Sequence, residues 1–68
     1  MVDTSKLRGV IVANDMTQEE VAKALGMAPK TFYSKMKKRV FGSDEIEDMI
    51  DLLHIDDPMS IFFAREVT

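Results

Sequence analysis

The chain has 68 residues, the length of one small domain, and 46% of them are hydrophobic, which argues against intrinsic disorder. It has no cysteine, which excludes a disulfide framework, and its apolar runs are far too short for a membrane span, so we expect a soluble, cytoplasmic protein. The net charge of −3 disfavours nucleic acid as a partner only on average, because residues 21–40 hold six bases and no acid, whereas residues 41–64 hold seven acids and no lysine or arginine.

The first predicted helix runs from about residue 5 to 13. Leu7, Val10 and Ile11 form one apolar stripe along it at helical spacing. Residues with a short polar side chain precede the stripe and can cap the helix; the candidates are Asp3, Thr4 and Ser5.

The second predicted helix has the clearest start. Thr17 is followed three residues later by Glu20, which is the spacing of a capping box. Met16 and Val21 have the spacing of a hydrophobic staple around that cap. Gly26 suits the end of the helix, where a residue with positive φ is needed. The apolar stripe between cap and glycine is Val21, Ala22 and Leu25.

The third predicted helix begins at Pro29, a residue favoured at the first helical position, and runs to about residue 38. Phe32 and Met36 lie on one of its faces. Only Met27 and Ala28 separate Gly26 from Pro29, so the second and third helices must cross steeply and pack against each other, with Ala22 allowing close approach.

Two further helices complete the chain, and no segment alternates as a strand does, which predicts an all-α domain of five short helices. Ser43 can cap the fourth helix, and Asp57 and Pro58 can begin a fifth that runs to about Phe63. The apolar stripe of the fourth helix is Ile46, Met49, Ile50 and Leu53.

The sequence TQEEVA at residues 17–22, followed by Leu25-Gly26 and Phe32, resembles the helix-turn-helix of phage Cro and CI repressors and of the wider XRE-type regulators. Residues 5–9, the helix from Ser43 and residues 61–63 also resemble small Cro-like prophage regulators. The resemblance implies that residues 1–68 form one lambda-repressor-like DNA-binding domain. It implies a transcriptional regulator, a Cro-like repressor without catalysis or cofactor, that binds a double-stranded operator.

The resemblance also implies the DNA-binding residues. Residues 29–37 would enter the major groove, with Gln18, Lys37 and Lys38 contacting phosphate. The helical spacing of Lys30, Ser34 and Lys37 independently puts these three side chains on one side of the third helix. The full set of expected DNA contacts is Gln18, Pro29, Lys30, Thr31, Tyr33, Ser34, Lys37 and Lys38.

Three residues depart from the family pattern. Ala28 offers no side-chain oxygen as a cap, Pro29 can make only apolar contact with a base, and Lys35 stands where an apolar residue is common. These departures and the acidic net charge leave open an alternative, in which the fold is kept but a protein partner binds the acidic fourth helix or the apolar C-terminus.

The remaining residues favour ordinary structural roles. His54 and the acidic residues of the fourth helix are expected at the surface, without a metal site. The apolar residues near the C-terminus favour self-association, and we expect a homodimer on DNA through Phe62 or Phe63; the alternative is that both phenylalanines only complete the core of their own chain. No membrane or small-molecule substrate is expected as a partner.

Overall fold

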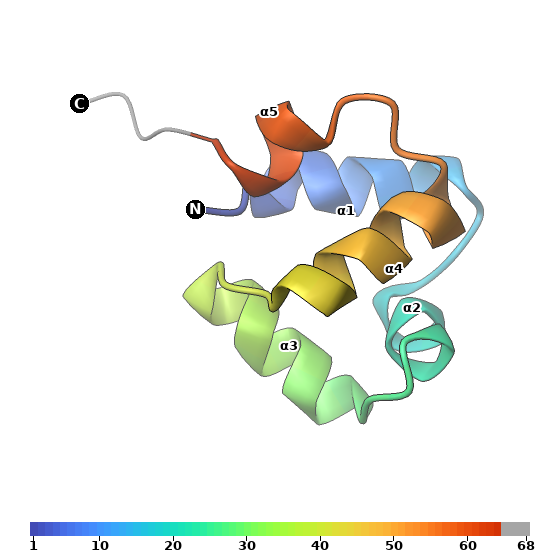
Figure 1. Cartoon of the computed structure of the whole chain (residues 1–68). Helices are drawn as coiled ribbons and strands as arrows, with labels where there is room; N and C mark the ends of the chain where they lie inside the picture. The colour runs from blue at the N-terminus through green and yellow to red at the C-terminus, as the bar shows by residue number, and fades with distance from the viewer. Residues whose placement is uncertain (65–68) are drawn as a thin grey trace.

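The computed structural model describes residues 1–64, which contain five α-helices (Figure 1). The predicted all-α class is therefore confirmed, and no strand occurs between residues 1 and 64. Within this range no helix is long and apolar enough to cross a membrane. The helices are α1 (Thr4–Ala13), α2 (Gln18–Ala24), α3 (Pro29–Lys38), α4 (Ser43–Leu53) and α5 (Pro58–Phe62).

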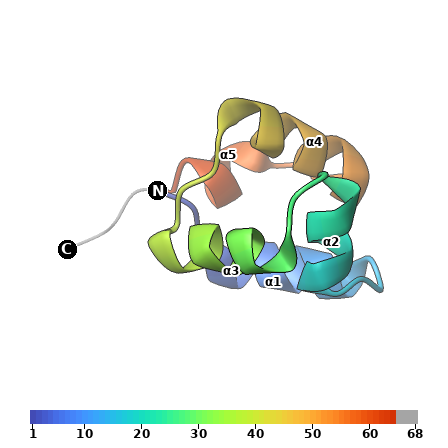
Figure 2. The ribbon, with the colours of Figure 1, turned by 90° about the horizontal axis from the view of Figure 1, so that it is seen from below.

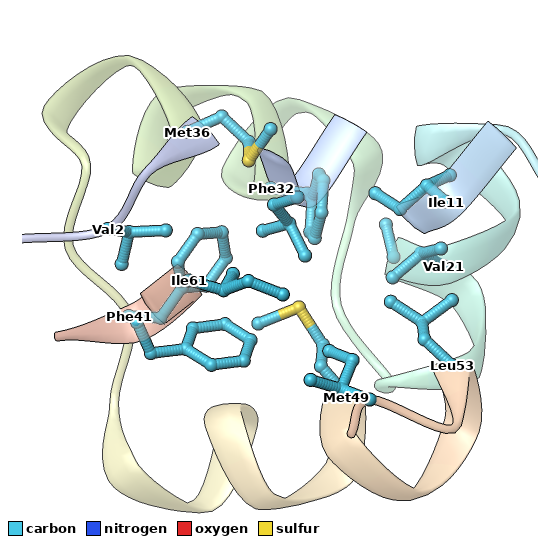
Figure 3. Close-up of a cluster of buried hydrophobic side chains, with 13 residues drawn as sticks. Val2, Ile11, Val21, Phe32, Met36, Phe41, Met49, Leu53 and Ile61 are labelled. Carbon is cyan, nitrogen blue, oxygen red and sulfur yellow. The ribbon is translucent and has the colours of Figure 1, made fainter. Parts of the chain in front are cut away.

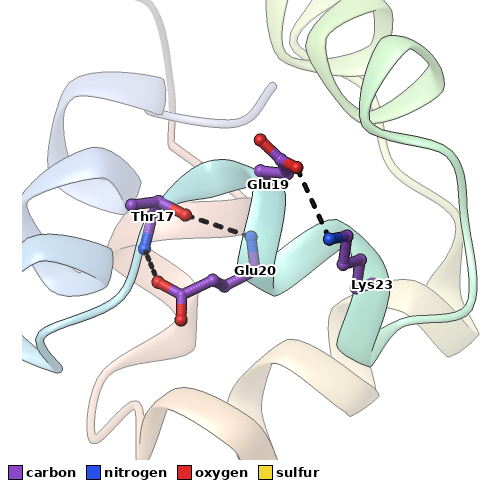
Figure 4. Close-up of polar contacts among 4 residues, drawn as sticks. All are labelled: Thr17, Glu19, Glu20 and Lys23. Atoms are coloured by element: carbon purple, nitrogen blue, oxygen red, sulfur yellow. Dashed lines mark hydrogen bonds and ion pairs between the residues drawn. The ribbon is translucent and has the colours of Figure 1, made fainter.

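Side-chain caps begin three of the helices, as the sequence predicts. Asp3 and Asp57 each accept a hydrogen bond from the backbone N–H three residues later, at the starts of α1 and α5. At the start of α2, the N–H of Thr17 donates to Glu20 Oε1 at 2.9 Å, and the N–H of Glu20 donates to Thr17 Oγ1 at 3.2 Å (Figure 4). This reciprocal pair is the predicted capping box, and such caps contribute about 1 kcal/mol each.

The predicted cap of α4 is wrong by one residue. Gly42 occupies the N-cap position, and Ser43 is the first residue of the helix. The N–H of Gly42 donates to Glu45 Oε1 at 2.7 Å, so Glu45 makes one half of a capping box, while glycine has no side chain to make the other half. The other boundaries differ little from expectation: α1 begins at Thr4, and Phe63 is the C-cap of α5.

The hydrophobic core lies between the helices, and all five of them contribute to it (Figure 3). Phe32 of α3 is fully buried, and its ring lies 5.4 Å from that of Phe41, centroid to centroid. Leu7 of α1, Met49 of α4 and Phe62 of α5 are buried in the same cluster. Because every helix contributes side chains to this core, the burial of one face of α3 in it fixes the orientation of α3.

The N-terminal segment ties the end of α3 to α5. Val2 and Arg39 are joined by two hydrogen bonds, in which Val2 N donates to Arg39 O at 3.2 Å and Arg39 Nε donates to Val2 O at 2.9 Å. One residue later, the N–H of Asp3 donates to Ile61 O at 2.6 Å. The N-terminal segment is therefore hydrogen-bonded both to Arg39 at the end of α3 and to Ile61 of α5.

The arrangement leaves the outer side of α3 open. α2 and α3 lie together at one end of the molecule, whereas α1 and α5 lie at the other (Figure 1). The view from below looks directly onto α3, which no other helix covers on that side (Figure 2).

Candidate nucleic-acid interface

The exposed face of α3 carries most of the residues that the sequence predicts to bind DNA. Phe32 and Met36 are buried, and the helical period of 3.6 residues turns Lys30, Ser34 and Lys37 to the opposite side. All three of these residues are exposed. One face of the helix is therefore buried in the core, and the opposite face is exposed to solvent.

The flanks of this face hold the other predicted residues of α3. Thr31 and Lys38 are exposed, Tyr33 is 48% exposed, and Pro29 is half-buried at the first position of the helix. Gln18 is half-buried at the start of α2, a separate helix that packs against α3. Helical geometry therefore brings together the seven predicted residues of α3, with Gln18 contributed by the neighbouring helix.

The start of α3 has no side-chain cap. Ala28 is its N-cap and makes no side-chain hydrogen bond, as its methyl group requires. Pro29 has no N–H to satisfy, so the uncapped donors are the N–H groups of Lys30 and Thr31, which have no acceptor among the described residues. Free N–H groups at a helix N-terminus, together with the helix dipole, favour an anion at this position.

The lysines of α3 differ in whether they have an ion-pair partner. Lys30, Lys37 and Lys38 make no ion pair with any residue from 1 to 64. By contrast, Lys35 Nζ lies 2.6 Å from Glu45 Oε2 of α4. Three uncompensated cations on the exposed face of one helix give it a positive local potential despite the net charge of −3.

The contact between Lys35 and Glu45 was not predicted from the sequence. Glu45 accepts hydrogen bonds with both oxygens, one from Lys35 and one from the N–H of Gly42 at 2.7 Å. Partial burial acts to raise the pKa of Glu45, but the hydrogen bond and charge of Lys35 and the hydrogen bond from Gly42 together lower the pKa below its ordinary value. The carboxylate is therefore ionised at neutral pH and joins α3 to α4.

Lysine and glutamate also pair within α2. Lys23 Nζ lies 3.5 Å from Glu19 Oε1, one helical turn away, and both side chains are largely exposed (Figure 4). An exposed pair of this kind contributes little to stability. Lys23 is nevertheless partly neutralised, so the basic character of residues 21–40 is concentrated on α3.

The acidic residues of α4 lie at the surface, as predicted, except Glu45, which is half-buried against Lys35. Asp44, Glu47, Asp48 and Asp51 are exposed, and His54 is exposed at the C-cap of the helix. Within residues 1–64, no three His, Asp or Glu side chains are grouped so as to hold a metal ion.

A second surface feature is an apolar patch around Phe63. The side chain of Phe63 is 55% exposed, whereas Phe62 is 3% exposed and belongs to the core. Phe63, Phe41 and Ile46 line both of two hollows, of about 410 and 220 Å³. The larger hollow extends along α4 to Ile50, and the smaller extends to Val40, just after α3. We call this surface the Phe63 patch. Of the two phenylalanines predicted for self-association, only Phe63 is available at the surface.

Comparisons with protein-family models, with curated proteins and with solved structures found no match to this chain. Its function must therefore be argued from the face of α3 and the Phe63 patch.

Proposed function

We propose that this protein is a sequence-specific regulator of transcription that binds double-stranded DNA through α3, as a Cro-like repressor does. The observation that carries the proposal is the exposed face of α3, on which Lys30, Lys37 and Lys38 have no carboxylate partner within the described chain. The packing of α2 against α3 supports it, because in a helix-turn-helix the second helix of such a pair lies in the major groove.

The proposed mechanism separates base reading from phosphate binding. Lys30 lies in the first turn of α3, where a lysine can donate to O6 and N7 of guanine. Tyr33 and Ser34 follow on the exposed side and can donate hydroxyl hydrogen bonds to bases or phosphates. Lys37 and Lys38 lie in the last turn, where they would neutralise phosphates and release counterions.

The first turns of α2 and α3 would position the protein on the DNA backbone. Gln18 in the first turn of α2 and the free N–H groups at the start of α3 are donors suited to phosphate oxygens. The absence of a hydroxyl at Ala28 is compatible with this role, because an intramolecular cap would compete with phosphate for those N–H groups. Occupation of an operator in this way would block access of polymerase to a promoter.

A salt-dependent DNA titration tests the proposal. Binding of a labelled duplex of random sequence is measured by fluorescence anisotropy for the parent and for the variant Lys30→Gln/Lys37→Gln/Lys38→Gln. We expect the parent to bind with an affinity that falls steeply with salt, and the variant to lose most of that dependence, about 0.9 in slope per lost phosphate contact.

The matched control removes three cations elsewhere, with Lys6→Gln, Arg8→Gln and Lys23→Gln on α1 and α2. These substitutions change the net charge equally, so they separate the face of α3 from a general charge effect. Equal losses in the two triple variants would contradict the proposed face, and a parent without affinity for duplex would refute DNA binding.

The Phe63 patch favours a second candidate, a helical module that binds a protein partner. The patch includes an exposed aromatic ring beside a hollow that Glu47 of α4 also lines. The same titration distinguishes the two functions, because an interaction module has no reason to bind random duplex more tightly than its Lys30→Gln/Lys37→Gln/Lys38→Gln variant does.

We also propose that a second copy of the chain covers the Phe63 patch, so that the regulator binds its operator as a homodimer. The smaller hollow includes Arg39 and Val40, which directly follow α3, so the patch adjoins the end of the proposed DNA-binding helix. An interface there would fix two copies of α3 relative to each other.

A further inference from the structure

Lys35 differs from the other lysines of α3 in what surrounds it. Its side chain is 34% exposed and ends 2.6 Å from a carboxylate oxygen of Glu45, whose side chain is 21% exposed. The other oxygen of Glu45 accepts the N–H of Gly42 at the start of α4. Glu45 is thus held in place by the helix it begins, and it in turn holds Lys35.

The position of Lys35 on α3 makes this contact relevant to DNA. Lys35 comes four residues after Thr31 and three before Lys38, so these three residues share one edge of the helix. Thr31 and Lys38 are exposed members of the proposed DNA-binding face. A Lys35 released from Glu45 would therefore be a fourth mobile cation at the margin of that face.

We propose that Glu45 is a specificity-determining residue that does not itself touch DNA. It acts by withholding Lys35 from the phosphates and by fixing α3 against α4. This inference rests on the proposed DNA binding. A lysine is a flexible point charge that can reach any nearby phosphate, so an additional free lysine strengthens binding to every sequence alike. Withholding it keeps non-specific affinity low, while the fixed α3 presents its base-reading residues in one orientation.

The test compares salt slopes and affinity ratios. The probes are a duplex of random sequence and a site enriched from a random library with the parent protein. The proteins are the parent, Glu45→Ala, Lys35→Gln and the double variant, with Glu47→Ala as the control. Glu47 is exposed on the same helix and has no ion-pair partner among residues 1–64, so its replacement removes the same charge without releasing a lysine.

We expect Glu45→Ala to bind random duplex more tightly and to increase the salt slope by about 0.9, the value for one phosphate contact. The ratio of affinities for the enriched and random duplexes should fall roughly threefold or more, because a less well oriented α3 loses base contacts on the enriched duplex, whereas the additional phosphate contact strengthens both duplexes equally. Lys35→Gln alone should leave the slope unchanged, and the double variant should return the slope to that of the parent. Glu47→Ala should not increase the slope.

Glu45→Gln is the control for a folding defect in Glu45→Ala, because its amide oxygen can still accept a hydrogen bond from the N–H of Gly42. We expect Glu45→Gln to change the salt slope and the affinity ratio in the same direction, to a smaller degree. Thermal unfolding of each variant is measured in parallel. A lower slope in Lys35→Gln would show that Lys35 already binds phosphate and would overturn the inference, as would an unchanged slope in both Glu45 variants. A parent that fails to bind any duplex would instead refute DNA binding and this inference together.

Discussion

On α3, neighbouring residues have separate roles because burial follows the helical period. Phe32 and Met36 are held in the core, while Lys30 and Lys37 remain exposed on the opposite side. If α3 binds DNA as proposed, substitutions on the exposed side should therefore alter DNA binding with little effect on folding. Their effects should also differ with position, because base contacts carry sequence information and phosphate contacts do not.

The first prediction uses this difference between Lys30 and Lys37. If Lys30 pairs with guanine, Lys30→Ala should cost about 1 to 3 kcal/mol on the enriched site and relax the base preference at one position. Lys37→Ala should weaken all sequences to a similar degree and lower the salt slope by about 1. Fluorescence anisotropy with the enriched site and its single-base variants measures both effects. Variants that both bind like the parent would show that DNA lies elsewhere.

The second prediction concerns the stability contributed by Glu45. Because Lys35 and Gly42 lower the pKa of Glu45 in the folded protein, the ionised carboxylate stabilises the fold. This contribution is fully present above the pKa of the unfolded chain and is lost as the pH falls through the lower pKa of the folded state. The parent should therefore exceed Glu45→Gln in free energy of unfolding at neutral pH, and the difference should shrink in acid.

Urea denaturation of the two proteins at several pH values between 7 and 3 measures that difference, with Glu47→Gln as the control for loss of one charge. A difference that grows on acidification would contradict the sign of the pKa shift. A zero difference at neutral pH would show that the pair contributes nothing to stability.

At the scale of whole helices, the starts were easier to predict than the ends. α1, α2, α3 and α4 all end with a left-handed residue, and in each the next N–H donates to the carbonyl five residues before it, as in a Schellman motif. Only α2 has glycine there, Gly26 with φ 75°, which is why only that end was recognised. The left-handed residues of the others are Asp15, Arg39 and His54.

The signal that was missed is the apolar residue after each of these positions. It is Met16, Met27, Val40 and Ile55 for α1 to α4 in turn.

The candidate site was also predicted only in part from the sequence. Periodicity alone predicts which residues of α3 are exposed, but the contact between Lys35 and Glu45 depends on how two helices pack, and so does the carboxylate cap that displaced Ser43.

The third prediction tests the end of α4. His54 has φ 52°, a conformation that costs an L-residue about 1 to 2 kcal/mol and costs glycine almost nothing. After allowance for the greater freedom of glycine in the unfolded chain, His54→Gly should stabilise the fold by up to about 1 kcal/mol, or roughly 4 to 8 °C in Tm. Ala24→Gly, at the last residue of α2, is the control and should destabilise the fold, by at most about 1 kcal/mol. Calorimetry showing a lower Tm for His54→Gly would mean that its side chain makes a stabilising contact.

For the whole molecule, the single proposed DNA-binding helix would contact only a few base pairs. A single module of this size buries about 600 to 1,000 Å² on DNA, which limits both affinity and the number of bases read. Two modules related by a two-fold axis would read half-sites about 34 Å apart, one turn of duplex. The Phe63 patch is the surface that we propose for this assembly, because an isologous contact needs one apolar surface that can pack against itself.

The last prediction is that Phe63→Asp weakens dimer formation without unfolding the chain. Phe63 is 55% exposed, so a carboxylate there is hydrated in the monomer but would be desolvated in the interface. Met59→Asp is the matched control, since Met59 is 65% exposed and lines neither hollow of the patch. Sedimentation equilibrium, alone and with a duplex that holds two half-sites, should show the parent and Met59→Asp as dimers on DNA and Phe63→Asp bound mainly as a monomer, with unchanged helical circular dichroism. A parent that binds this duplex only as a monomer would refute the dimer, and equal association of all three proteins would place the interface away from Phe63.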